Sequence, residues 1–302
     1  MGIGQSVLTK PRRPARRRMR GEGARRGILL LLLPLGVALS LGFVLPLVLL
    51  FVKSFQTSLG YGQVSGHLTF SAYVTAVTSP LYRTVALNAL EIGGIGTVLT
   101  LLLSFPLAYF IRFRLRRAQH TILLLIMISL FAGYIVKIYA WTTILGTYGL
   151  INTALAQIGL IDHPLSVLLF SKIAVLIVVT YLSIPVSTLI LVGAMQNVDR
   201  GLIENARDLG AGGIRAVTSV LVPLSSTGIV ASLAYGFVVI SGDYITPQLV
   251  GGTTGQMIGV PISDQFLNIG DQPLGSALSF LMLAVFALVY FGLTRLERFK
   301  GV

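Results

Sequence analysis

One short charged segment, residues 199–213, reads Asp-Arg-Gly-Leu-Ile-Glu-Asn-Ala-Arg-Asp-Leu-Gly-Ala-Gly-Gly and lies between two long apolar runs. These runs, residues 165–194 and 217–242, each exceed the roughly 20 residues that a helix needs to cross a bilayer. A polar segment between two such runs must lie at a membrane face. This charged island is also longer than a simple turn between two spans requires.

The composition around the island is that of an integral membrane protein. Of the 302 residues, 54% are hydrophobic and 11% are charged, whereas soluble domains hold roughly 25% charged residues. The mean hydropathy is +0.86. Six apolar runs are long enough to span, so the sequence predicts an all-α integral membrane protein with six transmembrane helices. The runs are residues 27–52, 84–111, 121–145, 165–194, 217–242 and 274–294.

The placement of basic residues supports six spans, because Lys and Arg collect in cytoplasmic loops. With the N-terminus inside, nineteen of the 23 basic residues fall on the inner side of the membrane. A net charge of +13 that is concentrated beside span ends reflects topology rather than a nucleic-acid-binding surface. The sequence therefore predicts a multi-pass protein with cytoplasmic N- and C-termini, in contact with the lipid bilayer and not with nucleic acid.

The chain divides into a tail and a membrane domain. Residues 1–26 are rich in Arg, Gly and Pro and lack apolar periodicity, which predicts a disordered basic cytoplasmic tail. Residues 27–302 would form the six-helix domain, beginning with an uncleaved span that is too long for a signal peptide. In the loop 53–83, apolar residues have a loose helical spacing that fits either an interfacial helix or a plain connector. The chain has no cysteine, which excludes disulfides and thiolate metal sites.

Four ionisable residues lie within the predicted spans, where insertion of a charge costs roughly 2.5–3.5 kcal/mol. They are Glu91, Lys137, Lys172 and Asp243. All four lie in the outer half of their spans, so their side chains can either extend to the outer interface or line a solute pathway. Glu91 and Lys137 lie deeper and are the better pathway candidates. Two acids and two bases leave the charge of a solute open.

The charged island itself has the pattern of a short amphipathic helix. Asp199 can cap a helix that begins at Arg200, and Gly210 followed by two more glycines ends it. Leu202, Ile203, Ala206 and Leu209 would form one apolar face. Taken alone, this pattern fits a surface loop as well as a helix that docks on another protein.

The residues around this helix carry a recognisable spacing. Glu204-Asn205-Ala206 is followed by Gly210 after three residues and, nine residues later, by Val220-Leu221-Val222-Pro223. This resembles the cytoplasmic signature of binding-protein-dependent ABC importer permeases, Glu-Ala-Ala, three residues, Gly, nine residues and Ile-x-Leu-Pro. Asn205, Val220 and Val222 depart from the family pattern by conservative changes.

The resemblance implies a type I ABC importer permease fold in a bacterial cytoplasmic (inner) membrane. A coupling helix, about residues 200–213 between the fourth and fifth spans, would insert into a separate ATPase subunit. The partners would be a second homologous permease, two cytoplasmic ABC ATPase subunits and an extracytoplasmic solute-binding protein. The residues that would couple to the ATPase are Glu204, Asn205, Ala206, Asp208, Leu209, Gly210 and Pro223.

No Gly-x4-Gly-Lys-Ser/Thr phosphate loop occurs in the sequence, and no catalytic or metal-ligating constellation is evident. We therefore expect no cofactor on this chain, with ATP and Mg²⁺ on the partner ATPase subunits. The chain would be a transport subunit and not an enzyme.

Further segments resemble the spermidine/putrescine branch of these permeases, among them Tyr148-Gly149-Leu150-Ile151-Asn152 and Gly242-Asp243-Tyr244-Ile245-Thr246-Pro247. Relatives with similar segments are associated with opines, phosphonates, thiamine or iron, so these solutes remain alternatives. Ammonium groups favour carboxylates and aromatic faces. The candidate pathway residues are Glu91, Lys137, Trp141, Asp243 and Tyr244. For Trp141, an interfacial aromatic belt is the more common role of such a residue.

Two other classes of protein compete with a permease. An ion-coupled secondary transporter would use the buried charges as a relay, but the sequence shows no convincing pair of related halves. An intramembrane enzyme would need a catalytic group, yet the three histidines, His67, His120 and His163, lie in separate loops.

Overall fold

The computed structural model describes residues 33–60, 62–115 and 117–299. The predicted disordered tail, residues 1–26, lies outside the described residues, as does the beginning of the first predicted span. The chain forms two compact units, Met1–Leu50 and Phe51–Val302. The described part of the first unit is helical: a π-helical turn, Ser40–Val44, leads into α2, Leu45–Lys53, which continues into the second unit.

Among the described residues, four helical stretches are individually long and apolar enough to cross a membrane. They are Leu33–Lys53, Pro80–Arg114, Lys172–Met195 and Gln272–Arg295. Two further helix pairs qualify only together, because each is sharply bent: Gln119–Phe131 with Tyr134–Gln157 by 90°, and Gly213–Leu224 with Ser226–Ser241 by 77°. If each bent pair is one span, the described helices supply up to six.

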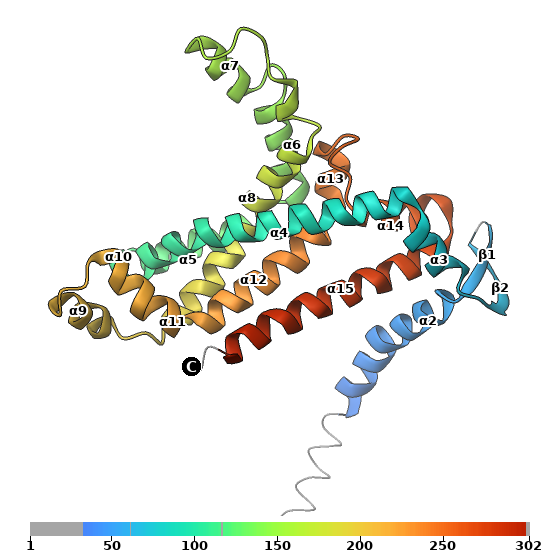
Figure 1. The fold of residues 1–302 in the computed structure, drawn as a ribbon, viewed down its shortest axis with the longest axis horizontal. Helices are drawn as coiled ribbons and strands as arrows, with labels where there is room; N and C mark the ends of the chain where they lie inside the picture. The colour runs from blue at the N-terminus through green and yellow to red at the C-terminus, as the bar shows by residue number, and fades with distance from the viewer. Residues whose placement is uncertain (1–32, 61, 116, 300–302) are drawn as a thin grey trace, which may run out of the picture. The chain divides into compact units, whose positions relative to one another are not determined.

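Three helices form the centre of the second unit: α4 (Pro80–Tyr109), α8 (Lys172–Met195) and α12 (Ser226–Ser241). Figure 1 shows α4 lying across α8 and α12. Glycines allow the close approach. A Cβ on Gly228 would lie 2.2 Å from the Cβ of Ala194, and one on Gly236 would lie 3.1 Å from the Cγ2 of Thr97.

Of the three glycines Gly93, Gly94 and Gly96 in α4, two lie at a close contact with another helix. A Cβ on Gly93 would collide with the Ser241 hydroxyl, and one on Gly96 would lie 3.3 Å from Ile240. Gly94 has nothing within 4 Å. The packing surface of α4 therefore includes Gly93 and Gly96 but not Gly94.

One end of the second unit holds the segment that follows the first span. Strands β1 (Gln56–Gly60) and β2 (Gln63–Leu68) pair antiparallel, and α3 (Ser71–Thr78) follows. The hairpin departs from the all-α prediction, because the short polar run with glycines at 60 and 62, both at positive φ, closes a turn. Helix α3 confirms a helix in this loop.

Two short helices and a π-helical turn lie between α12 and the last long helix, α15 (Gln272–Phe299). They are α13 (Ile245–Val250), α14 (Gly259–Asp264) and the turn Gln265–Ile269. The Asn88 amide of α4 donates to the carbonyls of Thr254 and Gln256, at 3.2 and 2.9 Å. These bonds attach the loop between α13 and α14 directly to α4.

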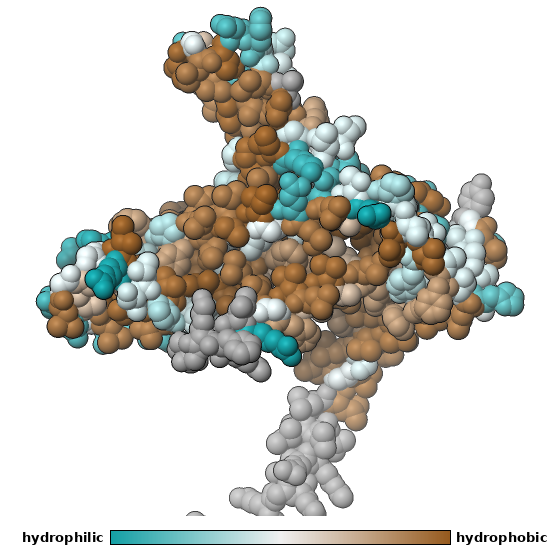
Figure 2. All heavy atoms as spheres, viewed as in Figure 1, coloured by the Kyte–Doolittle hydropathy of each residue, from teal (hydrophilic) through white to brown (hydrophobic). Residues whose placement is uncertain are grey.

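The remaining helices between α4 and α8 are α5 (Gln119–Phe131), α6 (Tyr134–Leu145) and α7 (Leu150–Gln157), with a 3-10 turn at Ser166–Leu168. At the opposite end of α4 lie a π-helical turn, Phe110–Arg114, and α9, Arg200–Asp208. They are followed by α10 (Gly213–Ala216), a π-helical turn (Val217–Leu221) and α11 (Val222–Leu224). Figure 2 shows hydrophobic residues over the middle of this unit and hydrophilic residues near α9.

The contact between Gly228 and Ala194 predicts a steric limit on helix packing. We expect Gly228→Ala to lower the free energy of unfolding by about 1–3 kcal/mol, because the added methyl overpacks the interface. Gly193→Ala is the matched control, since a Cβ there meets nothing within 4 Å. Thermal unfolding of both variants in detergent provides the measurement. Equal midpoints for the two variants would contradict the packing assigned to Gly228.

Candidate functional site

The charged island forms a capped helix, as predicted. The Asp199 side chain accepts a hydrogen bond from the Gly201 backbone N–H at 3.0 Å, which satisfies one of the free donors at the start of α9. Arg200 and Glu204 form an ion pair of 2.8 Å one turn apart. More than half of each side chain is exposed, so this pair contributes little to stability.

Gly210 terminates the helix for a backbone reason. Its φ of +90° lies in the left-handed region. The Gly210 N–H donates to the Arg207 carbonyl at 2.9 Å, and the Ala211 N–H donates to the Ala206 carbonyl at 3.0 Å. This pair of bonds is a Schellman motif, which directs the chain away from the helix.

The apolar residues of α9 face in two directions. Ile203 is only 3% exposed and packs with Ala206 into a cluster at the C-terminal ends of α4 and α8. Leu202 is 46% exposed and Leu209 is 89% exposed. The prediction of a single apolar face is therefore wrong: the turn at Gly210 carries Leu209 away from the cluster, and Leu202 lies beside Ile203 on the outward side.

The predicted coupling residues form one surface in large part. Of the predicted coupling residues, those exposed on α9 and its end are Glu204, Asn205, Asp208, Leu209 and Gly210. Ala206 is half-buried against the cluster, and Pro223 lies apart on α11, just before the 77° bend. Ile214, which the sequence did not single out, lies five residues after Leu209 and is another exposed apolar side chain, at 84%. A surface of this kind can dock against another protein.

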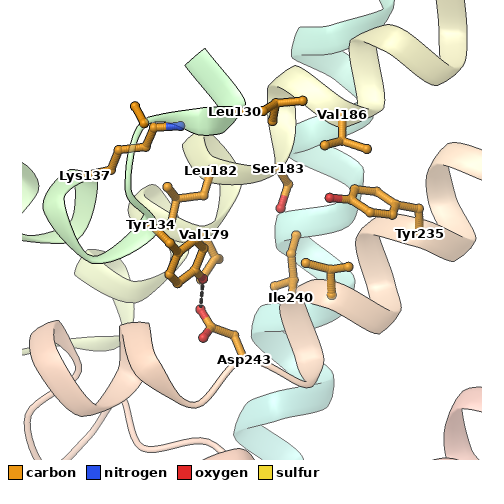
Figure 3. A pocket seen from close by; sticks show the side chains of 12 residues that line it. Leu130, Tyr134, Lys137, Val179, Leu182, Ser183, Val186, Tyr235, Ile240 and Asp243 are labelled. Carbon is orange, nitrogen blue, oxygen red and sulfur yellow. Dashed lines mark hydrogen bonds between the residues drawn. The ribbon is translucent and has the colours of Figure 1, made fainter. Parts of the chain in front are cut away.

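A second candidate site is a cavity of about 150 Å³ in the helical core. It lies where the break between α5 and α6 meets α8 and α12 (Figure 3). Its polar lining comes from Tyr134, Lys137, Ser183, Tyr235 and Asp243. The wall is completed by aliphatic side chains, including Val179, Leu182, Val186 and Ile240.

The Asp243 carboxylate is held by three donors. One oxygen accepts from the backbone N–H groups of Ile245 and Thr246, at 3.0 and 3.3 Å, which caps α13. The other accepts from the Tyr134 hydroxyl at 2.7 Å, the bond drawn in Figure 3. This carboxylate therefore connects the beginning of α6 to the corner between α12 and α13.

Lys137 also has a structural partner. Its Nζ donates to the Ser129 carbonyl at 2.5 Å, across the break between α5 and α6. A positive charge at the C-terminal end of a helix is favourable, because the last carbonyls are otherwise unpaired. The two charges in the cavity thus hold the α5–α6 break and the corner between α12 and α13.

The other predicted pathway residues lie elsewhere. Glu91 pairs with Lys172 at 3.0 Å, and both side chains are largely exposed. Trp141 packs edge-on against Tyr181, with ring centroids 5.3 Å apart. Tyr244 is 40% exposed and is not among the residues that line the cavity. Sequence reasoning missed Tyr134, Ser183 and Tyr235, because a single hydroxyl in an apolar run gives no signal of which helix it faces.

These features define a polytopic membrane protein with a pocket beside a helix break and a short, largely exposed helix, α9, at one end. The chain belongs to the family of binding-protein-dependent transport system inner membrane components, whose sequence pattern matches residues 26–300. It is thus an inner-membrane permease component of an ABC importer.

Two similar relatives are the spermidine/putrescine transport system permease proteins PotB of Haemophilus influenzae and Escherichia coli K12. The first is 31% identical over 82% of this chain and 86% of the relative, and the second is 31% identical over 83% and 92%. The inner membrane ABC transporter permease protein YdcU of E. coli K12 is 28% identical over 99% of this chain and 100% of its own length.

The fold is similar to that of a bacterial ABC transporter involved in the import of the acidic polysaccharide alginate. The TM-score is 0.72 at 17% identity, over 93% of this chain and 99% of the other. At this level of identity the likeness concerns the fold alone. It covers both the core and the helices around it.

The cap on α13 predicts an order of stability among variants. We expect Asp243→Ala to lower the free energy of unfolding by about 0.5–2 kcal/mol, because it leaves the Ile245 and Thr246 donors unpaired. Asp243→Asn should cost less, since its amide oxygen still accepts. Thermal unfolding in detergent measures both, with Asp162→Ala, at an exposed carboxylate, as the control. If the Ala and Asn variants unfold at the same temperature, the carboxylate does not act as a cap.

Proposed function

We propose that this chain is one of two permease subunits of an importer for polyamines, spermidine or putrescine, or for a related small organic solute. The observation that carries the proposal is the 31% identity, over more than four fifths of the chain, to two permeases named for spermidine and putrescine transport. The other subunit would be a homologous permease, and the two would enclose the solute pathway.

The cavity at Asp243 has groups that suit an amine. A protonated amine favours a carboxylate and the faces of aromatic rings, and Asp243, Tyr134 and Tyr235 provide these. The positive charge of Lys137 opposes a cation in the cavity, and its bond to the Ser129 carbonyl keeps that charge at the α5–α6 break. An arriving ammonium group would compete with the Tyr134 hydroxyl for the Asp243 carboxylate.

This competition gives a physical route to alternating access. Loss of the bond between Tyr134 and Asp243 would free the break between α5 and α6 from the corner of α12 and α13. Binding of solute would then favour the conformation in which these bends have moved, since a ligand shifts an equilibrium by its differential affinity for the two states.

The exposed surface of α9 supports a coupling helix. We place α9 and both chain termini in the cytoplasm, where one of two ATPase subunits would receive Leu209 and the exposed polar residues around it. ATP and Mg²⁺ would bind to those partner subunits, and an extracytoplasmic solute-binding protein would deliver the solute at the opposite membrane face. Glu91, Trp141 and Tyr244 remain pathway candidates at positions away from the cavity.

The turn at Gly210 provides a test of coupling. We expect Gly210→Ala to reduce uptake about tenfold in the reconstituted complex, because a side chain in the left-handed region costs about 1–2 kcal/mol. Gly212→Ala is the matched control: it lies two residues away at φ −58° and also has open space around it. Glu204→Lys should have the larger effect: it should abolish uptake while the protein still accumulates in the membrane. Unchanged transport-coupled ATP hydrolysis in Gly210→Ala and Glu204→Lys would reject the coupling helix.

The solute assignment has its own measurement. ATP-dependent uptake of labelled spermidine and putrescine into proteoliposomes should be competed by unlabelled polyamines and not by thiamine or molybdate. We expect Asp243→Asn to lower this uptake about tenfold, equivalent to one lost charge-assisted contact, and Asp162→Asn to leave it unchanged. If Asp243→Asn and Glu91→Gln both transport normally, neither residue belongs to the pathway. Uptake that continues without ATP and responds to uncouplers would point to an ion-coupled transporter.

A further inference from the structure

Helix α9 is attached to the membrane core by one face. Ile203 is inserted into the buried cluster that includes Ala108, Ile111 and Phe113 from the end of α4. Arg207, four residues further and therefore on the same face of the helix, donates a hydrogen bond to the Tyr109 hydroxyl at 3.2 Å. A hydrophobic contact and a directional polar contact thus join α9 to the same segment.

Aromatic contacts hold the Tyr109 side chain at the end of α4. It is the last residue of α4, and its ring packs against Phe110 and Phe113, with centroids 5.8 and 5.4 Å away. In the adjoining π-helical turn, the Arg112 guanidinium donates to the carbonyls of Met195 and Gln196 at the end of α8, both at 3.3 Å. A displacement of Tyr109 therefore displaces the end of α4 together with its neighbour α8.

Helix α4 is continuous from this joint to the far end of the molecule (Figure 1). Its 30 residues extend roughly 45 Å at about 1.5 Å per residue. Near the far end, Asn88 binds the carbonyls of Thr254 and Gln256, and the Tyr82 hydroxyl accepts from the Gln265 amide at 3.2 Å. The bent pairs α5–α6 and α11–α12 lack this continuity, with bends of 90° and 77°.

We propose that Tyr109 and Arg207 are positioning residues that form the joint between α9 and α4. Movement of α9 passes through their hydrogen bond to α4, and α4 carries it to the loop between α13 and α14, which Asn88 holds. The proposal rests on the coupling role of α9 given above. It adds the route by which a cytoplasmic motor reaches the face where a solute-binding protein delivers its cargo.

The test measures uptake and ATP hydrolysis separately in the complete reconstituted transporter. Tyr109→Phe removes only the hydroxyl, and Arg207→Gln removes the charged donor. We expect each to lower the amount of solute transported per ATP hydrolysed about fivefold, the equivalent of roughly 1 kcal/mol for the net loss of one exposed hydrogen bond, with ATP hydrolysis largely retained. Arg207→Lys should recover part of the loss, because its ammonium group can still donate.

Matched controls separate the joint from general effects. Tyr290→Phe and Arg295→Gln make the same chemical changes at exposed positions on α15, away from the joint, and their transport per ATP should equal that of the unmodified protein. The double variant Tyr109→Phe/Arg207→Gln should be no worse than either single variant, since both remove one bond. Thermal unfolding of Tyr109→Phe identifies any loss caused by misfolding.

Two outcomes would overturn the proposal. Normal transport per ATP in Tyr109→Phe would show that the bond transmits nothing, and losses that multiply in the double variant would show that the two residues act independently. Failure of the coupling role itself has a different signature: Gly210→Ala would then transport normally in the same preparation. Loss in Gly210→Ala with normal Tyr109→Phe would retain the coupling helix and reject this joint.

Discussion

Close packing of α4 against α8 and α12 is the constraint on which the rest of the structure depends. In a bilayer, apolar side chains gain nothing by leaving lipid for another helix, so association relies on close backbone approach and on a few polar contacts. Gly228 and Gly236 allow that approach from α12, and Gly93 and Gly96 allow it from α4. Buried hydroxyls complete the interface, with Ser187 and Ser232 bonded at 2.5 Å. The three helices therefore form a rigid frame.

Specific polar groups stabilise the places where helices break or turn beside this frame: the α5–α6 break and the corner between α12 and α13. Lys137 bridges the bend between α5 and α6, while Asp243 caps α13 and holds Tyr134. Charges in an apolar environment are expensive, and both of these compensate by pairing with groups that a helix break leaves free. The cavity lies where the α5–α6 break meets the corner between α12 and α13. Its polar groups both maintain the bends and suit a polar solute.

The two ends of α4 give this arrangement a direction. At one end α9 is attached through Ile203 and Arg207, while Leu209 is left exposed for a partner. At the other end Asn88 fixes the loop between α13 and α14. A continuous helix transmits displacement better than a bent pair. This difference suits α4 to connect the two ends of the molecule and the bent pairs to change shape.

The sequence by itself determined the membrane class, the apolar character of the long helices and the presence of a helix, Arg200–Asp208, within residues 199–213. Apolar length, charge placement and the Asp199 and Gly210 caps are local properties that need no knowledge of neighbours. It could not place Tyr134, Ser183 and Tyr235 together, nor separate Ile203 from Leu209, because an apolar run has no polar face to show its orientation. Only the tertiary structure decided which hydroxyls face one cavity and which charges hold the bends. Those choices depend on helix rotation and on the break at Gly133, which packing of α5 and α6 against α8 fixes.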